Sequence, residues 1–271
     1  MIGWAAGLAL LAGSTIHAAI ITNGDFESTT ATATATFNGW QELVGATPTD
    51  VASAVTGSNA ITTTSALMQA ASSGNGDLKQ SVASGPSQFR LEFDFAIYTD
   101  RPRASYSTGF LQLYVKHATN GQAQIRVTRP SASGGAATDP ADVVVYTGSA
   151  DLLALDDAVS VSTSLTDLKV NHMTIDMVYG APSSYVISVR DADGVTHTSS
   201  SLTQFTGGVS NAGSKLTELD FNRGYLSYHS TYSHTTAVLD NVTVSVPEPG
   251  AMALAILGLT GAMGLLRRRR R

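Results

Sequence analysis

The densest group of side chains able to recognise a ligand lies in the segment 224–234, which reads GYLSYHSTYSH. Its aromatic and imidazole residues are Tyr225, Tyr228, Tyr232, His229 and His234. In a strand, Tyr228, Tyr232 and His234 would share one face. Flat aromatic rings combine an apolar face with a polar tip, which suits sugar rings. We therefore predict glycan contact by Tyr225, Tyr228, Tyr232, His234 and Trp40. The alternative is ordinary packing of these tyrosines at a sheet edge and of Trp40 in the core.

A second pattern places Glu218, Asp220 and Asn222 at alternate positions of one expected strand. It resembles the Glu-x-Asp-x-Glu strand of laminarinase-type glycosidases, in which one Glu is the nucleophile and the other the general acid. Retaining hydrolysis needs two carboxyl groups about 5–5.5 Å apart, and Asn222 cannot replace the second acid. Glu92 and Asp94 form another pair, which equally fits the polar face of a strand. We predict no catalytic residue, and a glycosidase or lyase stays the least favoured alternative.

Other catalytic and metal-binding patterns are missing from the sequence. The chain of 271 residues has no cysteine, which excludes a disulfide framework, a thiolate zinc site and a cysteine nucleophile. No H-E-x-x-H spacing, G-x-S-x-G setting, P-loop or dinucleotide fingerprint occurs. The function classes that depend on these motifs are therefore disfavoured.

The elements that would carry these side chains are strands. Short runs alternate apolar and polar residues and end at Gly, Asn, Asp, Ser or Pro. The expected strands are Phe89–Tyr98, Phe110–His117, Ala123–Arg129, His172–Tyr179, Ser184–Asp191, Lys215–Asn222 and Ala237–Val246. Asn120-Gly121 and Asp193-Gly194 mark hairpin turns. About ten to fourteen strands without a long helical period predict an all-β fold, a two-sheet antiparallel sandwich of the jelly-roll kind.

The two ends of this body resemble carbohydrate-binding jelly rolls of the galactose-binding-like type. The resemblance is carried by Asn23–Glu27 at the start, by Gly39-Trp40 and by Leu239–Val242 on the last strand. The middle, from His172 to Gly194, looks more like a concanavalin or laminin-G sandwich, so the topology stays open between these types.

The galactose-binding-like resemblance also implies that the first and last strands lie together and often hold a structural calcium ion. Calcium takes several hard oxygen ligands. Asp25, Glu27 and Asp240 are the candidate ligands on this basis, and solvated strand ends are the alternative.

Both ends of the chain look like targeting signals. Residues 1–18, MIGWAAGLALLAGSTIHA, have an apolar stretch followed by small residues and a passable cleavage site after Ala18. At the other end, Pro247, Glu248 and Pro249 precede the apolar stretch 251–266 and the run Arg267–Arg271. This stretch is close to the length of a membrane-spanning helix, and the arginines would stay cytoplasmic by the positive-inside rule.

The triplet, the apolar span and the arginine cluster resemble the PEP-CTERM sorting signal. The resemblance implies that exosortase, a membrane protease-transpeptidase, processes the chain, with Pro247, Glu248 and Pro249 as substrate residues. The expected division is therefore 1–18 as signal peptide, 19–245 as β-sandwich and 246–271 as sorting signal.

The net charge of the chain and its distribution limit the classes of ligand that the body could bind. The net charge is −5, although five of the 16 basic residues form the terminal run Arg267–Arg271, so the rest of the chain is more acidic. An acidic body disfavours nucleic acid as a partner, because phosphate binding needs clustered basic residues. It suits neutral sugars or calcium as ligands. We predict an exported cell-surface or matrix protein that is held transiently in the cytoplasmic membrane and binds exopolysaccharide. A structural or adhesive matrix protein without a glycan pocket is the alternative.

Overall fold

The computed structural model of the chain describes most of the body between the two ends. The described ranges are 20–29, 37–42, 46–50, 55–56, 64–69, 77–83, 85–99, 108–117, 121–129, 135–180, 182–206, 214–222 and 235–246. Within them, no helix has the length and hydropathy that a membrane crossing requires. The predicted signal peptide 1–18 and the apolar stretch 251–266 lie outside the described residues.

The described residues form strands and contain no helix, which confirms the all-β prediction. The strands are β1 (Gln41–Glu42), β2 (Ala46–Asp50), β3 (Val55–Thr56), β4 (Thr64–Gln69), β5 (Asp77–Ser81), β6 (Gln88–Thr99), β7 (Thr108–His117), β8 (Gln122–Arg129), β9 (Ala141–Tyr146), β10 (Asp151–Val159), β11 (Val161–Ser162), β12 (Leu168–Val178), β13 (Ser184–Arg190), β14 (Thr196–Thr198), β15 (Leu216–Asn222) and β16 (Thr235–Ser245).

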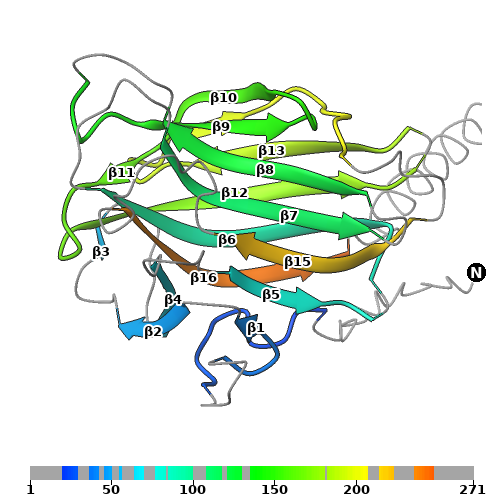
Figure 1. The fold of residues 1–271 in the computed structure, drawn as a ribbon, viewed down its shortest axis with the longest axis horizontal. Helices are drawn as coiled ribbons and strands as arrows, with labels where there is room; N and C mark the ends of the chain where they lie inside the picture. The colour runs from blue at the N-terminus through cyan, green and yellow to red at the C-terminus, as the bar shows by residue number, and fades with distance from the viewer. Residues whose placement is uncertain are drawn as a thin grey trace, which may run out of the picture.

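These strands form two sheets packed face to face (Figure 1). The seven-stranded sheet has the order β1-β5-β15-β7-β8-β9-β10, and the nine-stranded sheet runs β14-β13-β12-β6-β16-β4-β2 with β3 and β11 attached at its side. Pairing is antiparallel apart from the short β11–β6 and β12–β3 contacts. The predicted antiparallel sandwich is therefore confirmed.

The core lies between the two sheets and is built by alternation along each strand. On β7, Leu111, Leu113 and Val115 are buried in the core. On β15, Phe221 and Leu219 stand opposite Leu113 and Val115 in register. Because side chains of a strand point alternately to its two faces, the residues between these apolar ones face away from the core. This alternation creates the polar outer face described below.

The start of the described chain lies against the last strand, as the resemblance implied. The Val242 amide of β16 donates to the Gly24 carbonyl oxygen at 2.7 Å. A Cβ at Gly24 would lie 1.8 Å from the Val242 carbonyl oxygen, so only glycine permits this approach. The segment 20–29 nevertheless forms turns and bends instead of the expected first strand.

Trp40 lies in the core and is 2% exposed. Its ring packs between Phe26 and Phe221, with ring centroids 5.3 and 6.1 Å away. Its indole nitrogen donates to the Asn23 carbonyl oxygen at 3.0 Å. The structure thus places Trp40 in the packing role that was the alternative to glycan contact, because no face of the ring is open to a sugar.

Candidate functional site

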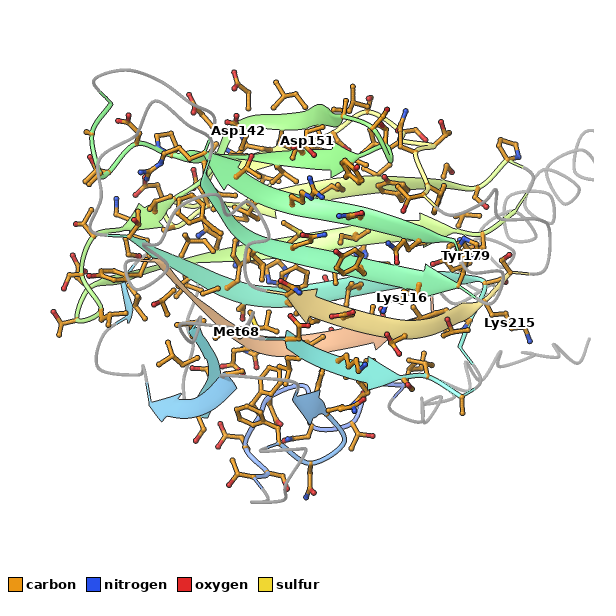
Figure 2. All side chains as sticks on the ribbon, in the orientation of Figure 1. Met68, Lys116, Asp142, Asp151, Tyr179 and Lys215 are labelled. Atoms are coloured by element: carbon orange, nitrogen blue, oxygen red, sulfur yellow. The ribbon has the colours of Figure 1, made fainter. Side chains whose placement is uncertain are left out.

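The outer face of the seven-stranded sheet carries a continuous set of polar side chains over β5, β15, β7 and β8. The register aligns them in rows across the strands. Tyr114 of β7 stands between Asp220 of β15 and Gln124 of β8. Figure 2 shows the side chains of this face, with Lys116 over β7 and Asp151 at β10. We call the residues Asp77, Lys79, Gln112, Tyr114, Lys116, Gln124, Arg126, Glu218, Asp220 and Asn222 the polar face.

One row of the polar face contains buried oxygen atoms that make no hydrogen bond to the described residues. Asn222 stands in register between Asp77 of β5 and Gln112 of β7. Gln112 is 1% exposed and Asn222 is 9% exposed. The oxygens Gln112 Oε1, Asn222 Oδ1 and Asp77 Oδ1 are buried and have no hydrogen-bond partner among the described residues. Since buried polar groups are nearly always paired, this row is the most unusual feature of the face.

The pKa of the Asp77 carboxyl reflects the burial of this row. Burial, followed by the nearby charge of Asp220, raises the pKa of the Asp77 carboxyl from 3.8 to about 6, against the opposing effects of Lys79 and Lys116. Perturbed carboxyl groups gather at functional sites, although structural ion pairs perturb them as well. The sequence reasoning missed Asp77 and Gln112, and the signal that could have found Gln112 is the polar alternation of 110–117.

Arg126 anchors the far side of the polar face. Its Nη1 lies 2.9 Å from Asp151 Oδ1 of β10, and its guanidinium stacks 4.2 Å from the centre of the Tyr146 ring. The side-chain amide of Gln124 is oriented so that its oxygen faces the donors of Arg126 and Gln112. In this orientation Gln124 Oε1 accepts from Arg126 Nη2 at 2.7 Å and from Gln112 Nε2. The amide nitrogen of Gln112 then donates a hydrogen bond to Gln124, while the amide oxygen of Gln112 has no partner among the described residues.

Lys116 joins the two carboxylates of the glycosidase-like pattern. Its Nζ lies 2.5 Å from Glu218 Oε1 and 2.9 Å from Asp220 Oδ2. The ammonium thus occupies the space between the carboxylates, where glycoside hydrolysis would need the scissile bond. Asn222, at the third position of the pattern, belongs to the buried row. The geometry supplies no positive evidence of catalysis.

A second acidic group lies on the nine-stranded sheet and includes the predicted calcium ligands. Asp240 of β16 is 1% exposed and stands opposite Asp94 of β6. Burial, followed by the charges of Asp94, Glu27 and Asp25, raises the pKa of Asp240 from 3.8 to about 7, even though the Asn241 amide donates to it. Asp25, Glu27 and Asp94 thus lie close enough to Asp240 to act on its pKa, but Asp25, Glu27 and Asp240 are not a group of described residues whose ligand atoms all lie within 4.8 Å of one another.

Asp94 also connects this group to a hollow on the outer surface of the same sheet. Asp94 Oδ1 lies 2.8 Å from His172 Nδ1, and this hydrogen bond raises the pKa of His172. The hollow has a volume of about 290 Å³ and is lined by His172, Thr174, Ser188, Arg190 and Thr196. Glu92 lies 3.8 Å from His172 Nε2, so the pair Glu92 and Asp94 flanks a histidine here.

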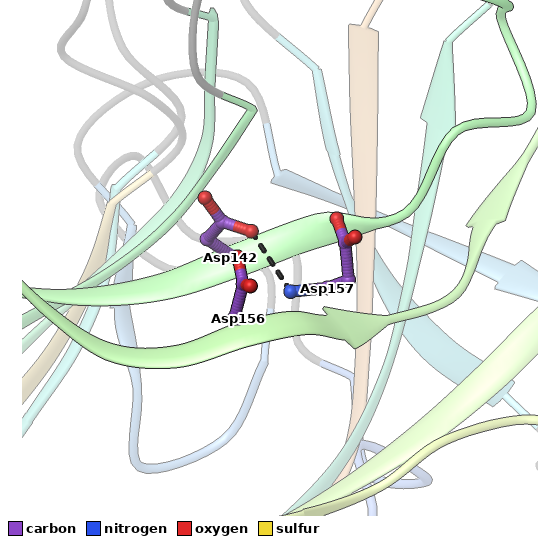
Figure 3. A group of neighbouring side chains, drawn as sticks. All are labelled: Asp142, Asp156 and Asp157. Atoms are coloured by element: carbon purple, nitrogen blue, oxygen red, sulfur yellow. Dashed lines mark hydrogen bonds between the residues drawn. The ribbon is translucent and has the colours of Figure 1, made fainter.

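A third acidic group was not predicted from the sequence. Asp142, Asp156 and Asp157 of β9 and β10 each offer a carboxylate oxygen, and these oxygens lie within 4.8 Å of one another (Figure 3). Asp142 is buried, and its Oδ1 accepts from the Asp157 amide at 2.9 Å. A register shift between β9 and β10 brings the three together, which the sequence pattern does not reveal.

The other predicted site residues lie outside the described residues. They are the glycan-contact candidates Tyr225, Tyr228, Tyr232 and His234 and the sorting triplet Pro247, Glu248 and Pro249. Their roles stay predictions.

Comparison with known proteins identifies the C-terminal segment. Residues 245–271 match the family model described as the PEP-CTERM protein-sorting motif. The chain carries a PEP-CTERM sorting motif. This confirms the resemblance read from the Pro-Glu-Pro triplet, the apolar span and the arginines. The PEP-CTERM motif indicates export with C-terminal processing and anchoring, and it implies an exosortase-processed surface protein.

Solved structures similar to the chain include both carbohydrate-binding and carbohydrate-cleaving sandwiches. An endo-β-1,4-glucuronan lyase of the fungus Trichoderma reesei is 8% identical, over 78% of this chain and 92% of that one, with a TM-score of 0.47. The carbohydrate-binding module CBM66 of Bacillus subtilis is 14% identical, over 76% and 95%, with a TM-score of 0.34. A legume lectin-like domain of Entamoeba histolytica is 8% identical, over 68% and 84%, with a TM-score of 0.40. No curated protein sequence matches the chain. Likenesses this distant transfer neither an activity nor a ligand.

Proposed function

We propose that the chain is a non-catalytic cell-surface or extracellular-matrix protein whose sandwich binds exopolysaccharide through the polar face. The observation that carries the proposal is the buried row Asp77, Asn222 and Gln112, whose oxygens have no partner among the described residues. An unmade hydrogen bond at a buried group costs about 1–3 kcal/mol. A sheet that retains several such groups side by side is organised for a ligand that satisfies them.

Binding fits this face better than turnover does. The Lys116 ammonium lies between Glu218 and Asp220 and is bonded to one oxygen of each, which does not suit a pair of carboxylates acting on a glycosidic bond. The face also carries the buried amides of Gln112 and Asn222, the carboxyl group of Asp77 and the partly exposed ring of Tyr114. Amide and carboxylate groups recognise sugar hydroxyls, and aromatic rings contact sugar faces.

The test is retention by polysaccharide. The full chain is run in native gels containing exopolysaccharide from its own host, beside the variants Asn222→Leu and Asp176→Asn. Asp176 lies on the outer face of the other sheet in an exposed pair with Arg90 and serves as the matched control. We expect retardation of the wild type and Asp176→Asn, and loss of retardation for Asn222→Leu. Equal mobility of all three proteins with and without polysaccharide would favour a structural matrix protein without a glycan pocket.

We further propose that the apolar stretch 251–266 holds the chain in the cytoplasmic membrane with the sandwich outside, until exosortase removes the tail. The Pro247 to Pro249 triplet at the membrane edge and the cytoplasmic arginines support this order. Mass spectrometry of the exported protein should find a mature form without Arg267–Arg271. A mature form that keeps these arginines would contradict removal of the tail.

We also propose a structural calcium ion held by Asp25, Glu27 and Asp240. The proposal is supported by the buried Asp240 carboxyl, whose pKa is raised by burial and by the charges of Asp94, Glu27 and Asp25, and by the preference of calcium for several oxygen ligands. Calcium should raise the denaturation midpoint of the wild type and of Asp156→Asn, and should not raise that of Asp240→Asn. The same calcium response in Asp240→Asn would exclude this site, and a response lost in Asp156→Asn would assign the ion to the third acidic group.

A further inference from the structure

The unpaired atoms of the polar face are all hydrogen-bond acceptors. They are Asp77 Oδ1, Gln112 Oε1, Asp220 Oδ1 and Asn222 Oδ1, none of which has a hydrogen-bond partner among the described residues. A carboxylate accepts only, and the buried unpaired atoms of Gln112 and Asn222 are their amide oxygens. A ligand for this face must therefore bring donors to several acceptors at once.

The acceptors are spaced for an extended ligand. Asp77, Asn222 and Gln112 stand in register on the adjacent strands β5, β15 and β7. Neighbouring strands lie about 4.8 Å apart, so the row spans roughly 10 Å across the sheet. A chain of sugar rings laid across the strands offers hydroxyl groups at more than one point along this row.

The charges of the face leave little attraction for an anionic ligand. Lys116 is shared by Glu218 and Asp220, and Arg126 is paired with Asp151. The remaining cation of the face, Lys79, stands directly opposite Asp220 in register. Each cation of the described polar face thus already lies beside a carboxylate, whereas Asp77 has a carboxylate oxygen to spare. A uronate or sulfate placed on the row would meet like charge.

We infer that the ligand of the polar face is a neutral, hydroxyl-rich glycan whose hydroxyl groups donate to Asp77, Asn222 and Gln112. This inference rests on the proposed function and narrows its ligand to one chemical class. It separates this face from sites that grip a sugar carboxylate through unpaired arginine or lysine side chains.

The test compares neutral and acidic polysaccharides that share a backbone. The full chain is titrated by calorimetry, in buffer with EDTA, against glucan and glucuronan, galactan and galacturonan, and mannan and mannuronan. We expect a neutral member to bind at least about tenfold more tightly than its acidic counterpart, and Asn222→Leu to weaken that binding by about tenfold or more, which is the scale of one lost hydrogen bond. Asp176→Asn should bind like the wild type.

The other outcomes are distinguishable. Tighter binding of the acidic member of a pair overturns the neutral ligand class while glycan binding stands. Binding that disappears in EDTA and returns with calcium overturns direct contact between hydroxyl groups and the acceptor row. Binding of no polysaccharide, in EDTA or in calcium, overturns the proposed function itself.

Discussion

Replacing Asn222 by leucine tests whether the buried row of polar side chains binds a ligand or stabilises the fold. Asn222 is 9% exposed, and its Oδ1 has no partner among the described residues. Leucine has a similar size and removes the unmade hydrogen bond, which costs about 1–3 kcal/mol. The free energy of unfolding should therefore rise by about 1–3 kcal/mol, and each kcal/mol should raise Tm by about 2–4 °C in a domain of this size.

Asn171 supplies the matched control, because it is a buried asparagine on a strand with every polar group paired. Its Oδ1 accepts from the Ser160 amide at 2.8 Å, and its Nδ2 donates to the carbonyl oxygens of Ser160 and Lys169 at 3.0 and 3.3 Å. Asn171→Leu would leave these backbone groups of Ser160 and Lys169 without their side-chain partner. It should therefore lower the free energy of unfolding by about 2–4 kcal/mol.

Urea denaturation of the full chain, followed by circular dichroism, measures both variants. The reasoning requires opposite signs, with Asn222→Leu more stable and Asn171→Leu less stable than the wild type. A loss of stability in Asn222→Leu comparable to that of Asn171→Leu would refute it, because Asn222 would then be a structural residue. Higher stability together with lost glycan binding is the signature of a residue kept for function.

The contribution of Asp240 to stability should fall as pH rises from about 4 to 7, because a native pKa of about 7 against 3.8 means that the folded state binds the proton more tightly. Urea midpoints across this range should depend less steeply on pH in Asp240→Asn, in which Asp77, whose pKa is also raised, keeps part of the slope; an unchanged slope would contradict the assignment. Neither the wild type nor Glu218→Gln should release reducing ends from polysaccharide, and the variant should lose about 1 kcal/mol or less of stability; release by the wild type that Glu218→Gln abolishes would establish an enzyme. Gly24→Ala should cost roughly 2–3 kcal/mol in the same urea assay because its Cβ would lie 1.8 Å from the Val242 carbonyl oxygen. Gly180→Ala, whose Cβ would lie 3.5 Å from the Pro182 carbonyl oxygen, should stay close to the wild type; equal effects would contradict the close packing at Gly24.

Local patterns predicted the central strands well, because alternation of apolar and polar residues reflects a half-buried strand. The predicted range Phe89–Tyr98 falls inside β6, and Phe110–His117 falls inside β7. The Asp193-Gly194 turn is confirmed by the positive φ of 87° at Gly194. β10 escaped prediction because its residues 151–157 are largely exposed and two register shifts interrupt its pairing with β9.

The site depended on contacts that no local pattern contains. The sequence pattern identified Glu218 and Asn222 as part of a strand motif. Their neighbours Lys116 and Gln112 lie about a hundred positions away in the sequence and contact them only through the β7–β15 register. No local pattern predicts these contacts. Burial of Trp40 likewise follows from the packing of distant rings. The sorting motif was readable because its parts are consecutive in the sequence and are recognised as a linear signal.

Nuclear magnetic resonance of the side-chain amides tests the central claim most directly, since it observes the proposed contact atoms themselves. The full chain is titrated with the neutral polysaccharide fragment that it binds, and the Asn222, Gln112 and Asn171 side-chain signals are followed. The account predicts saturable shifts of Asn222 and Gln112 with Asn171 unmoved. Saturable binding that leaves Asn222 and Gln112 unmoved would contradict it.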